Sequence, residues 1–126
     1  MFKYDASQYD PPAPVASVTL RNSATGAAAD NIELLLDTGA DATLLPRAAV
    51  ARLGVEPLPD LQYELMGFDG SRSLASVAIM DMVFLGRTYR GRYLLIDADH
   101  GILGRDVINH LILLLDGPKQ QWSQPT

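Results

Sequence analysis

The stretch IELLLDTGADATLL, residues 32–45, places an aspartate, Asp37, directly after an apolar run and follows it with threonine and glycine. An isolated carboxylate withdrawn from water is costly, so such a group acquires hydrogen-bond donors, a counter-charge or a raised pKa. A small hydroxyl residue and a glycine beside it allow backbone N–H groups to hold the carboxylate while it faces a cleft. The stretch predicts a working carboxylate at the end of a strand. The alternative is an aspartate that only caps its own turn.

A single carboxylate can act as a base but not simultaneously as an acid. Two carboxylates within hydrogen-bond distance share one proton, so the ionised partner can deprotonate a water while the protonated partner polarises a carbonyl. The chain has one Asp-Thr-Gly and, at 126 residues, fits one compact domain. The economical source of the second acid is Asp37 of a second copy across a twofold axis. Asp69, in FDGS, is instead expected at a hairpin tip, because Asp-Gly favours a tight turn.

Composition excludes several classes of function. The net charge of -5 and pI near 4.7 leave no basic stripe for phosphates, so neither a nucleic acid nor an anionic membrane surface is an expected partner. There are no cysteines, and the two histidines, His100 and His110, lack ligand spacing, so we expect no metal and no cofactor. Charges and prolines stand where a signal peptide needs an apolar region, and no apolar run approaches a membrane span. A soluble cytoplasmic protein is expected.

Periodicity and turn residues predict a mostly β chain. Pro46, followed by an apolar pattern and Gly54, predicts a short helix, and a second helical turn is expected from Arg105 to about His110. Strands are expected over residues 15–20, 32–37, 88–97 and 111–115, with a strand, turn and strand over residues 61–86. Three regions follow: a flexible proline-rich arm (residues 1–13), one domain (residues 14–116) and a polar, frayed tail (residues 117–126).

Two segments, LLLDTGADATLL (residues 34–45) and GILGRDVI (residues 101–108), resemble the signature of the retropepsin-like, or retroviral-type, aspartic protease family. The order of parts is also similar: strand, Asp-Thr-Gly turn, flap hairpin, strands, Gly-Arg-Asp helix and terminal strand. The resemblance extends over about residues 14–116. It implies an all-β, single-domain closed barrel with one or two short helices, acting as a twofold homodimer. In retroviral members the two chain ends form an interdigitated dimer sheet.

The resemblance also implies a role for each residue of the first motif. Asp37 would supply one half of the catalytic dyad. Thr38 would grip the backbone of the partner's turn across the dimer. Gly39 and Ala40 would complete the turn, and Asp41 would lie at the edge of the substrate channel.

The second motif and the hairpin between the motifs receive supporting roles by the same resemblance. Arg105 is the family's partner for Asp41, and Asp106 would hydrogen-bond near Thr43 to tie the Gly-Arg-Asp helix under the active-site loop. Phe68 would be an apolar tip that closes over bound peptide. The flap residues are Met66, Gly67, Phe68, Asp69 and Gly70.

The expected function is an aspartic endopeptidase that hydrolyses peptide or protein substrates through a water activated between two Asp37 carboxylates. It would use no metal and form no covalent intermediate. Because the dyad shares one proton, activity should be greatest at mildly acidic pH. One alternative is a module of the same fold that dimerises or binds peptide without cleaving it. Another is a monomer in which the proline-rich arm lies over the dimer edge until activation.

Overall fold

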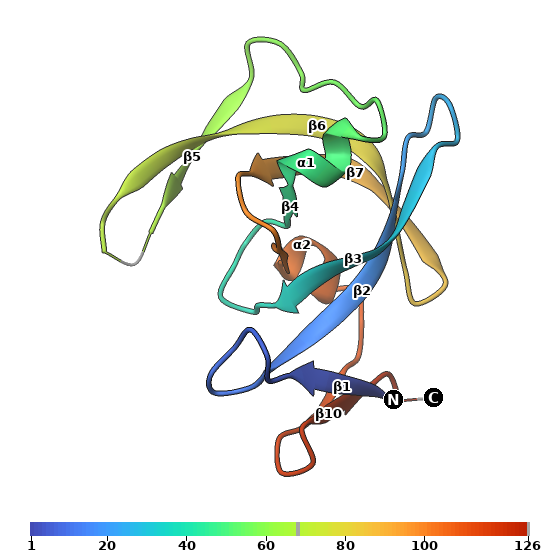
Figure 1. Cartoon of the computed structure of the whole chain (residues 1–126), viewed down its shortest axis with the longest axis vertical. Helices are drawn as coiled ribbons and strands as arrows, with labels where there is room; N and C mark the ends of the chain where they lie inside the picture. The colour runs from blue at the N-terminus through green and yellow to red at the C-terminus, as the bar shows by residue number, and fades with distance from the viewer. Residues whose placement is uncertain (68, 126) are drawn as a thin grey trace.

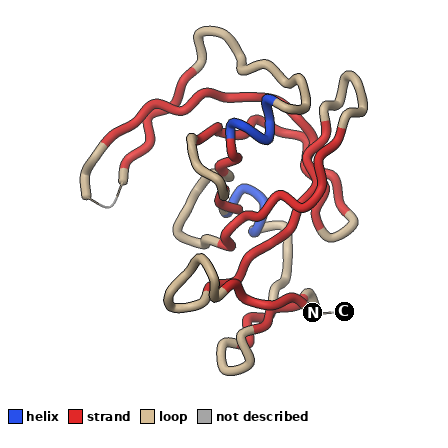
Figure 2. Tube along the Cα trace, in the orientation of Figure 1, coloured by secondary structure: helices blue, strands red, loops and turns tan. Residues whose placement is uncertain are grey.

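The computed structural model describes residues 1–67 and 69–125, which form ten strands and two short helices. The predicted all-β class is confirmed, and Figure 2 shows both helices within the curve of the strands. The elements are β1 (Phe2–Asp5), β2 (Ala13–Arg21), β3 (Ala28–Leu36), β4 (Leu44–Pro46), α1 (Arg47–Ala51), β5 (Gln62–Met66), β6 (Arg72–Phe84), β7 (Arg87–Ile96), β8 (Gly101–Leu103), α2 (Arg105–Ile108), β9 (Leu114–Asp116) and β10 (Gln121–Ser123).

The β2–β3 hairpin contains the first two predicted strands. Ala16, Val18 and Leu20 are buried on one face of β2, whereas Ser17 between them is exposed, as the two-residue period predicted. β3 runs antiparallel to β2, with Val15 opposite Leu35. The hairpin therefore fixes where β3 ends, one residue before Asp37.

The central strands close into a ring of pairings (Figure 1). The long strand β6 pairs on one side with β7 and, near its end, also with β2. The ring then runs through β3, β8 and β4 back to β7, and the β3–β8 and β4–β7 pairings are parallel. The ring brings the Asp37 and Gly-Arg-Asp segments together, although more than sixty residues separate them in the chain.

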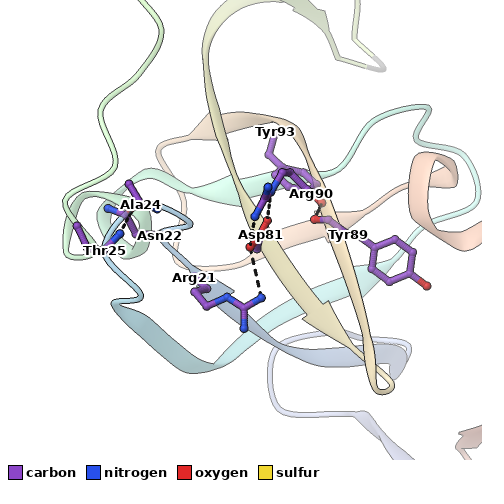
Figure 3. A network of polar contacts seen from close by, with 8 residues as sticks. All are labelled: Arg21, Asn22, Ala24, Thr25, Asp81, Tyr89, Arg90 and Tyr93. Atoms are coloured by element: carbon purple, nitrogen blue, oxygen red, sulfur yellow. Dashed lines mark hydrogen bonds and ion pairs between the residues drawn. The ribbon is translucent and has the colours of Figure 1, made fainter.

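A buried ion cluster lies where the ring closes (Figure 3). Asp81 of β6 is only 2% exposed, and it accepts hydrogen bonds from Arg90 of β7 (2.7 and 3.1 Å) and Arg21 of β2 (3.3 Å). The hydrogen bond from Arg90 and, to a lesser extent, that from Arg21 hold the pKa of the Asp81 carboxyl below its usual range. A buried carboxylate thus joins the three strands whose pairing completes the ring.

The main hydrophobic core lies against the ring and includes a tryptophan from the end of the chain. Leu20, Leu34, Leu45, Met80 and Leu103, from five different strands, are fully buried in it. Their burial joins the ring strands to α1 and α2, which contribute Val50 and Val107. This packing holds β3 and β8 side by side, and the functional residues follow directly after these two strands.

Both helices begin where the sequence predicts. α1 follows Pro46, and the chain leaves it through Gly54, whose φ of +72° is the left-handed conformation that glycine adopts without strain. α2 begins at Arg105, and a turn continues from it to His110. Neither helix of the described segments has the length and apolar character needed to cross a bilayer.

The two ends of the chain differ from the expected flexible arm and frayed tail. β1 pairs with both β2 and β10, and β10 pairs with β9, so the ends form one terminal sheet. Trp122 anchors this sheet: it is 1% exposed, stacks on Phe2 with ring centroids 4.4 Å apart, and donates from Nε1 to the Val15 carbonyl (2.8 Å). The run expected over residues 111–115 is a strand only from Leu114, where β10 lies alongside it.

Candidate active site

Asp37 lies at the point where two parallel strands end. Leu36, the last residue of β3, pairs with Leu103, the last residue of β8. The Asp37 N–H then donates to the Leu103 carbonyl (3.1 Å). This hydrogen bond continues the β3–β8 ladder by one residue. Because β3 and β8 are held by the core, the position of the Asp37 backbone is fixed as well.

The turn after Asp37 holds the carboxylate by one of its oxygens. The Gly39 N–H donates to Asp37 Oδ1 (2.9 Å), and the Ala40 N–H donates to the Asp37 carbonyl (3.2 Å). Asp37 is half-buried, while Thr38 and Gly39 are exposed. Within the described chain no hydrogen bond reaches the second oxygen, Oδ2. The carboxylate is therefore oriented by its own turn and keeps one oxygen free to bind a proton or a water.

Glycine at position 39 follows from the same close approach. A Cβ on Gly39 would lie 3.1 Å from Asp37 Oδ1, a distance tighter than ordinary van der Waals contact. A larger residue would push on the carboxylate that the Gly39 N–H holds. This contact explains why Asp37 and Gly39 occur together, with only Thr38 between them.

The predicted contact between Asp106 and Thr43 is present. Asp106 accepts two hydrogen bonds from Thr43, from its backbone N–H to Oδ2 (3.0 Å) and from its hydroxyl to Oδ1 (2.6 Å). The Thr43 hydroxyl in turn accepts the Gly104 N–H (3.1 Å), and Thr43 is buried. The first turn of α2 is thereby joined to the loop that follows Asp37.

Arg105 contacts the same loop but not at the residue predicted. Its Nη1 donates to the Thr38 carbonyl (2.6 Å), and its backbone N–H donates to the Ala40 carbonyl (2.9 Å). In the described chain Arg105 forms no ion pair with Asp41, which is exposed. An exposed ion pair gains only about 0–1 kcal/mol, so a carbonyl within reach competes successfully for the guanidinium.

Gly104 brings α2 as close to the loop as two backbones can lie. A Cβ on Gly104 would lie 2.5 Å from the Ala42 carbonyl oxygen and 3.1 Å from that of Ala40. Any side chain at this position would force the loop and the helix apart. The Gly-Arg-Asp segment therefore braces the Asp37 turn through close packing, a guanidinium and a carboxylate.

The β5–β6 hairpin projects from the ring (Figure 1) and contains the predicted flap. Its turn is closed by hydrogen bonds from the Gly67 N–H to the Ser71 carbonyl (2.8 Å) and from the Ser71 N–H to Asp69 Oδ1 (2.9 Å). Gly70, with φ +83°, supplies the left-handed residue that the turn requires. The predicted apolar tip, Phe68, lies outside the described residues.

Asp69 is therefore at the hairpin tip, as the Asp-Gly signal predicted, rather than beside Asp37. The Ser71 hydroxyl and the Ser71 N–H bind its carboxylate and lower the pKa of Asp69. Met66 precedes the turn with its side chain 68% exposed, so the hairpin presents apolar surface as well as a charge.

The base of the hairpin contains residues that the sequence reasoning missed. A cavity of about 240 Å³ lies between the hairpin and the end of β7, lined by residues that include Arg47, Leu65 and Ser73. Arg47 donates from Nε to Asp97 (2.9 Å) and from Nη1 to the Ser76 hydroxyl (3.2 Å). Its sequence neighbours form an ordinary helix start, so no local signal identified it.

His100 lies beside a glutamate. His100 Nδ1 lies 3.4 Å from Glu33 Oε2, and burial raises the pKa of the Glu33 carboxyl. Over the part of the chain that the structure describes, no group of three or more His, Cys, Asp or Glu side chains is placed to hold a metal ion. The groups around Asp37 are carboxylates, hydroxyls and backbone amides, which suit proton transfer.

Comparisons with known proteins agree with this geometry. A sequence model of the aspartyl protease family matches residues 16–107, which include the first motif, the hairpin and all but the last residue of the second motif. Among solved structures, EIAV protease complexed with the inhibitor HBY-793 is 26% identical, with a TM-score of 0.58; the match covers 78% of this chain and 86% of that one. No curated protein matches the chain. The chain belongs to the retropepsin-like aspartyl protease family.

Proposed function

We propose that this protein is an aspartic endopeptidase whose active site forms when the Asp37 carboxylates of two subunits meet across a twofold axis. The observation that carries the proposal is the braced Asp37 turn: Oδ1 accepts a backbone N–H while no hydrogen bond in the described chain reaches Oδ2. Membership of the aspartyl protease family supports the same chemistry.

Among the described aspartates of the two motifs and the hairpin, none other than Asp37 is a good source of the second carboxylate. Asp69 closes the hairpin turn, and Asp106 is held by two hydrogen bonds from Thr43. Asp41 is exposed, and the turn that holds Asp37 does not involve it. A second copy of Asp37 supplies an identical, equally braced carboxylate, and the twofold axis makes the two acids equivalent until a proton distinguishes them.

Hydrolysis then requires only these two acids and a water. The ionised Asp37 removes a proton from the water as the water oxygen attacks the peptide carbonyl carbon. The protonated Asp37 donates its proton to the carbonyl oxygen. The resulting tetrahedral diol breaks its C–N bond as the leaving nitrogen takes a proton from one Asp37, while the other Asp37 takes back a proton from a diol hydroxyl. The products are a carboxyl and an amino terminus, and one proton is again shared between the two acids.

The surrounding residues would position the substrate and the partner. Thr38, exposed at the turn, would grip the partner's turn, with its own carbonyl held by Arg105. The hairpin would close over an extended peptide, and the exposed side chains of Met66 and Leu74 would contact apolar residues of that peptide. Burying such contacts contributes roughly 25 cal/mol per Å² of apolar surface.

The test compares the Asp37→Asn variant with the parent on a mixed peptide library. Asparagine keeps the size and the Gly39 contact but cannot share a proton, so cleavage should fall by at least about 10³-fold, the scale on which removing a central catalytic group acts. Asp99→Asn is the matched control, because Asp99 is exposed and lies outside both motifs and the hairpin. Equal cleavage by the parent and Asp37→Asn would reject the proposal.

The second candidate function is a dimerising or peptide-binding module without turnover. The Gly39 N–H to Asp37 Oδ1 bond favours it, because a carboxylate that caps its own turn is sufficient for structure alone. The same two proteins decide between the functions. A binding module would hold labelled peptides with unchanged affinity in Asp37→Asn, and neither protein would cleave them.

A further inference from the structure

The strand β7 is unpaired on one side over most of its length. β6 pairs along one side of β7, but on the other side β4 pairs only with residues 94–96. The Leu94 N–H faces β4, because it donates to the Thr43 carbonyl (3.4 Å). Alternate residues of a strand direct their backbone groups to the same side, so the N–H and C=O groups of Arg90 and Arg92 face the unpaired side. In the described chain these groups form no backbone hydrogen bond outside the strand pairings.

A cavity of about 440 Å³ lies between this part of β7 and α2. It is lined by residues 88–93 of β7 and, from α2 and the turn after it, by Asp106, Val107 and His110. The strand side of the cavity is held by a side chain, because the Tyr93 hydroxyl donates to the Tyr89 carbonyl (2.6 Å; Figure 3). We call this cavity and the unpaired side of β7 the β7 groove.

The β7 groove is basic in an acidic protein. Residues 87–92 contain three of the chain's ten lysines and arginines and no acid, whereas the whole chain has a net charge of -5. The two carboxylates beside it are already bound, Asp81 by two arginines and Asp106 by a threonine. Arg90 binds Asp81 and still has a side chain that is 66% exposed. Arg92 is exposed and forms no ion pair in the described residues. The groove can therefore accept further negative charge.

We propose that the β7 groove binds an extended acidic segment of another protein, which adds to the unpaired side of β7 as an antiparallel strand. Residues opposite each other in such a pair have Cβ atoms about 4.5–5.5 Å apart. Two acids of the segment, separated by one residue, would therefore lie opposite Arg90 and Arg92. Main-chain hydrogen bonds would provide affinity, and the alternate carboxylates would provide specificity. The inference goes beyond the proposed function, because binding here requires no cleavage.

Two other occupants fit the β7 groove less well. The same strand of a second copy would place arginines opposite one another, which is unfavourable. A nucleic acid carries negative charge but has no row of alternating N–H and C=O groups that could pair with the backbone of Arg90 and Arg92. An acidic polypeptide matches both the charge of the groove and its unpaired backbone groups.

The experiment measures binding of fluorescent peptides by anisotropy. The full chain carrying Asp37→Asn is the reference, so that no peptide is cleaved and the result does not depend on catalysis. Arg92→Glu is added to it, and Arg92→Gln repeats the test with a milder change. Arg52→Glu is the matched control, because Arg52 is also exposed, forms no ion pair in the described chain and lines a different cavity. Circular dichroism confirms that each variant is folded.

Four probes separate charge from strand pairing. The first is a short peptide in which glutamate alternates with threonine, and the second has glutamine in place of glutamate. Because Arg90 and Arg92 direct their N–H and C=O groups toward the added strand, the glutamates opposite them must do the same in an antiparallel pair. The third probe therefore carries N-methyl groups on its glutamate nitrogens, and its control carries them on the threonine nitrogens. The fourth probe is an oligouridylate of equal charge.

We expect the reference and Arg52→Glu to bind the glutamate peptide equally, and Arg92→Glu to bind it about fivefold or more weakly, because an attraction becomes a repulsion. The glutamine peptide and the peptide methylated at glutamate should bind weakly, whereas methylation at threonine should be tolerated. No binding by the reference, or equal binding by Arg92→Glu, overturns the β7 groove. Equal loss in Arg52→Glu overturns it in favour of a general charge effect. Full binding of the peptide methylated at glutamate overturns the strand pairing, and tighter binding of oligouridylate overturns the choice of a polypeptide.

Discussion

The carboxylate of Asp106 receives both polar hydrogens of Thr43, although the two residues are 63 positions apart. The Thr43 hydroxyl lies 2.6 Å from Oδ1 and accepts the Gly104 N–H on its other side, while the Thr43 carbonyl accepts the Leu94 N–H (3.4 Å). Every polar atom of this buried threonine is therefore paired. The pair connects the loop after Asp37 to α2 and so helps to hold the Asp37 turn in place.

Thr43→Val should destabilise the protein by about 1–3 kcal/mol, because it leaves a carboxylate oxygen and the Gly104 N–H without partners inside the protein. Urea denaturation measures this loss, and a peptide-cleavage assay should show reduced kcat in the same variant. Thr43→Ser keeps the hydroxyl and should retain most of both quantities. A Thr43→Val protein as stable and active as the parent would show that the hydroxyl does not brace the site.

Stability should depend on the ionisation of Asp81. Hydrogen bonds from Arg90 and Arg21 lower the pKa of Asp81 in the folded protein. A lowered pKa means that this group contributes stability above its unfolded-state pKa, and that the contribution is lost as the pH falls through its folded-state pKa. The parent should therefore lose stability in that acidic window, as measured by urea denaturation at a series of pH values.

Asp81→Asn is the matched variant for this pH series. It should be less stable than the parent at neutral pH, because two arginines lose their carboxylate, and its stability should fall less on acidification. Parallel stability curves for the two proteins across the acidic range would mean that other carboxylates cause the acid sensitivity.

Trp122 should contribute more to stability than is expected of a residue in a polar, frayed tail. Trp122→Ala removes a fully buried ring that stacks on Phe2 and packs near Phe84, at 4.4 and 6.1 Å between centroids. Truncating a buried aromatic residue costs about 3–5 kcal/mol. Thermal unfolding measures the loss, and Trp122→Phe should recover part of it. Unchanged unfolding of Trp122→Ala would show that the terminal sheet is not coupled to the core.

Removal of residues 1–13 tests whether this segment stabilises the fold or inhibits the protein. If this segment blocked the dimer edge, its removal would raise the activity. The structure instead pairs β1 with β2 and β10, so the deletion should expose Trp122 and lower both stability and activity. Cleavage assays on the truncated chain, compared with the full chain at equal concentration, distinguish the two outcomes.

The parts of the fold that the sequence predicts are those with strong local signals. The alternation in β2, the Asp69-Gly70 turn and the helix after Pro46 each follow from a few neighbouring residues. The contact between Asp106 and Thr43 was predicted from the resemblance, because the spacing of the two motifs is similar to that of a known family.

The parts that the sequence did not predict depend on contacts between distant residues. Trp122 stands among polar residues, so no periodicity indicates that it completes a sheet with Phe2 at the other end of the chain. The resemblance assigns Asp41 as the partner of Arg105, and only the folded loop shows that Arg105 binds the Thr38 carbonyl instead. Asp81 sits in an apolar run, and its two arginines come from other strands.

The central claim is that two copies of Asp37 form one site, and mixing subunits tests it most directly. A fixed amount of the parent is unfolded and refolded together with increasing amounts of Asp37→Asn, and peptide cleavage is measured at each ratio. If the site needs both carboxylates, mixed dimers are inactive and cleavage per parent molecule falls steadily as the variant is added. Cleavage per parent molecule that stays constant at every ratio would contradict a shared site.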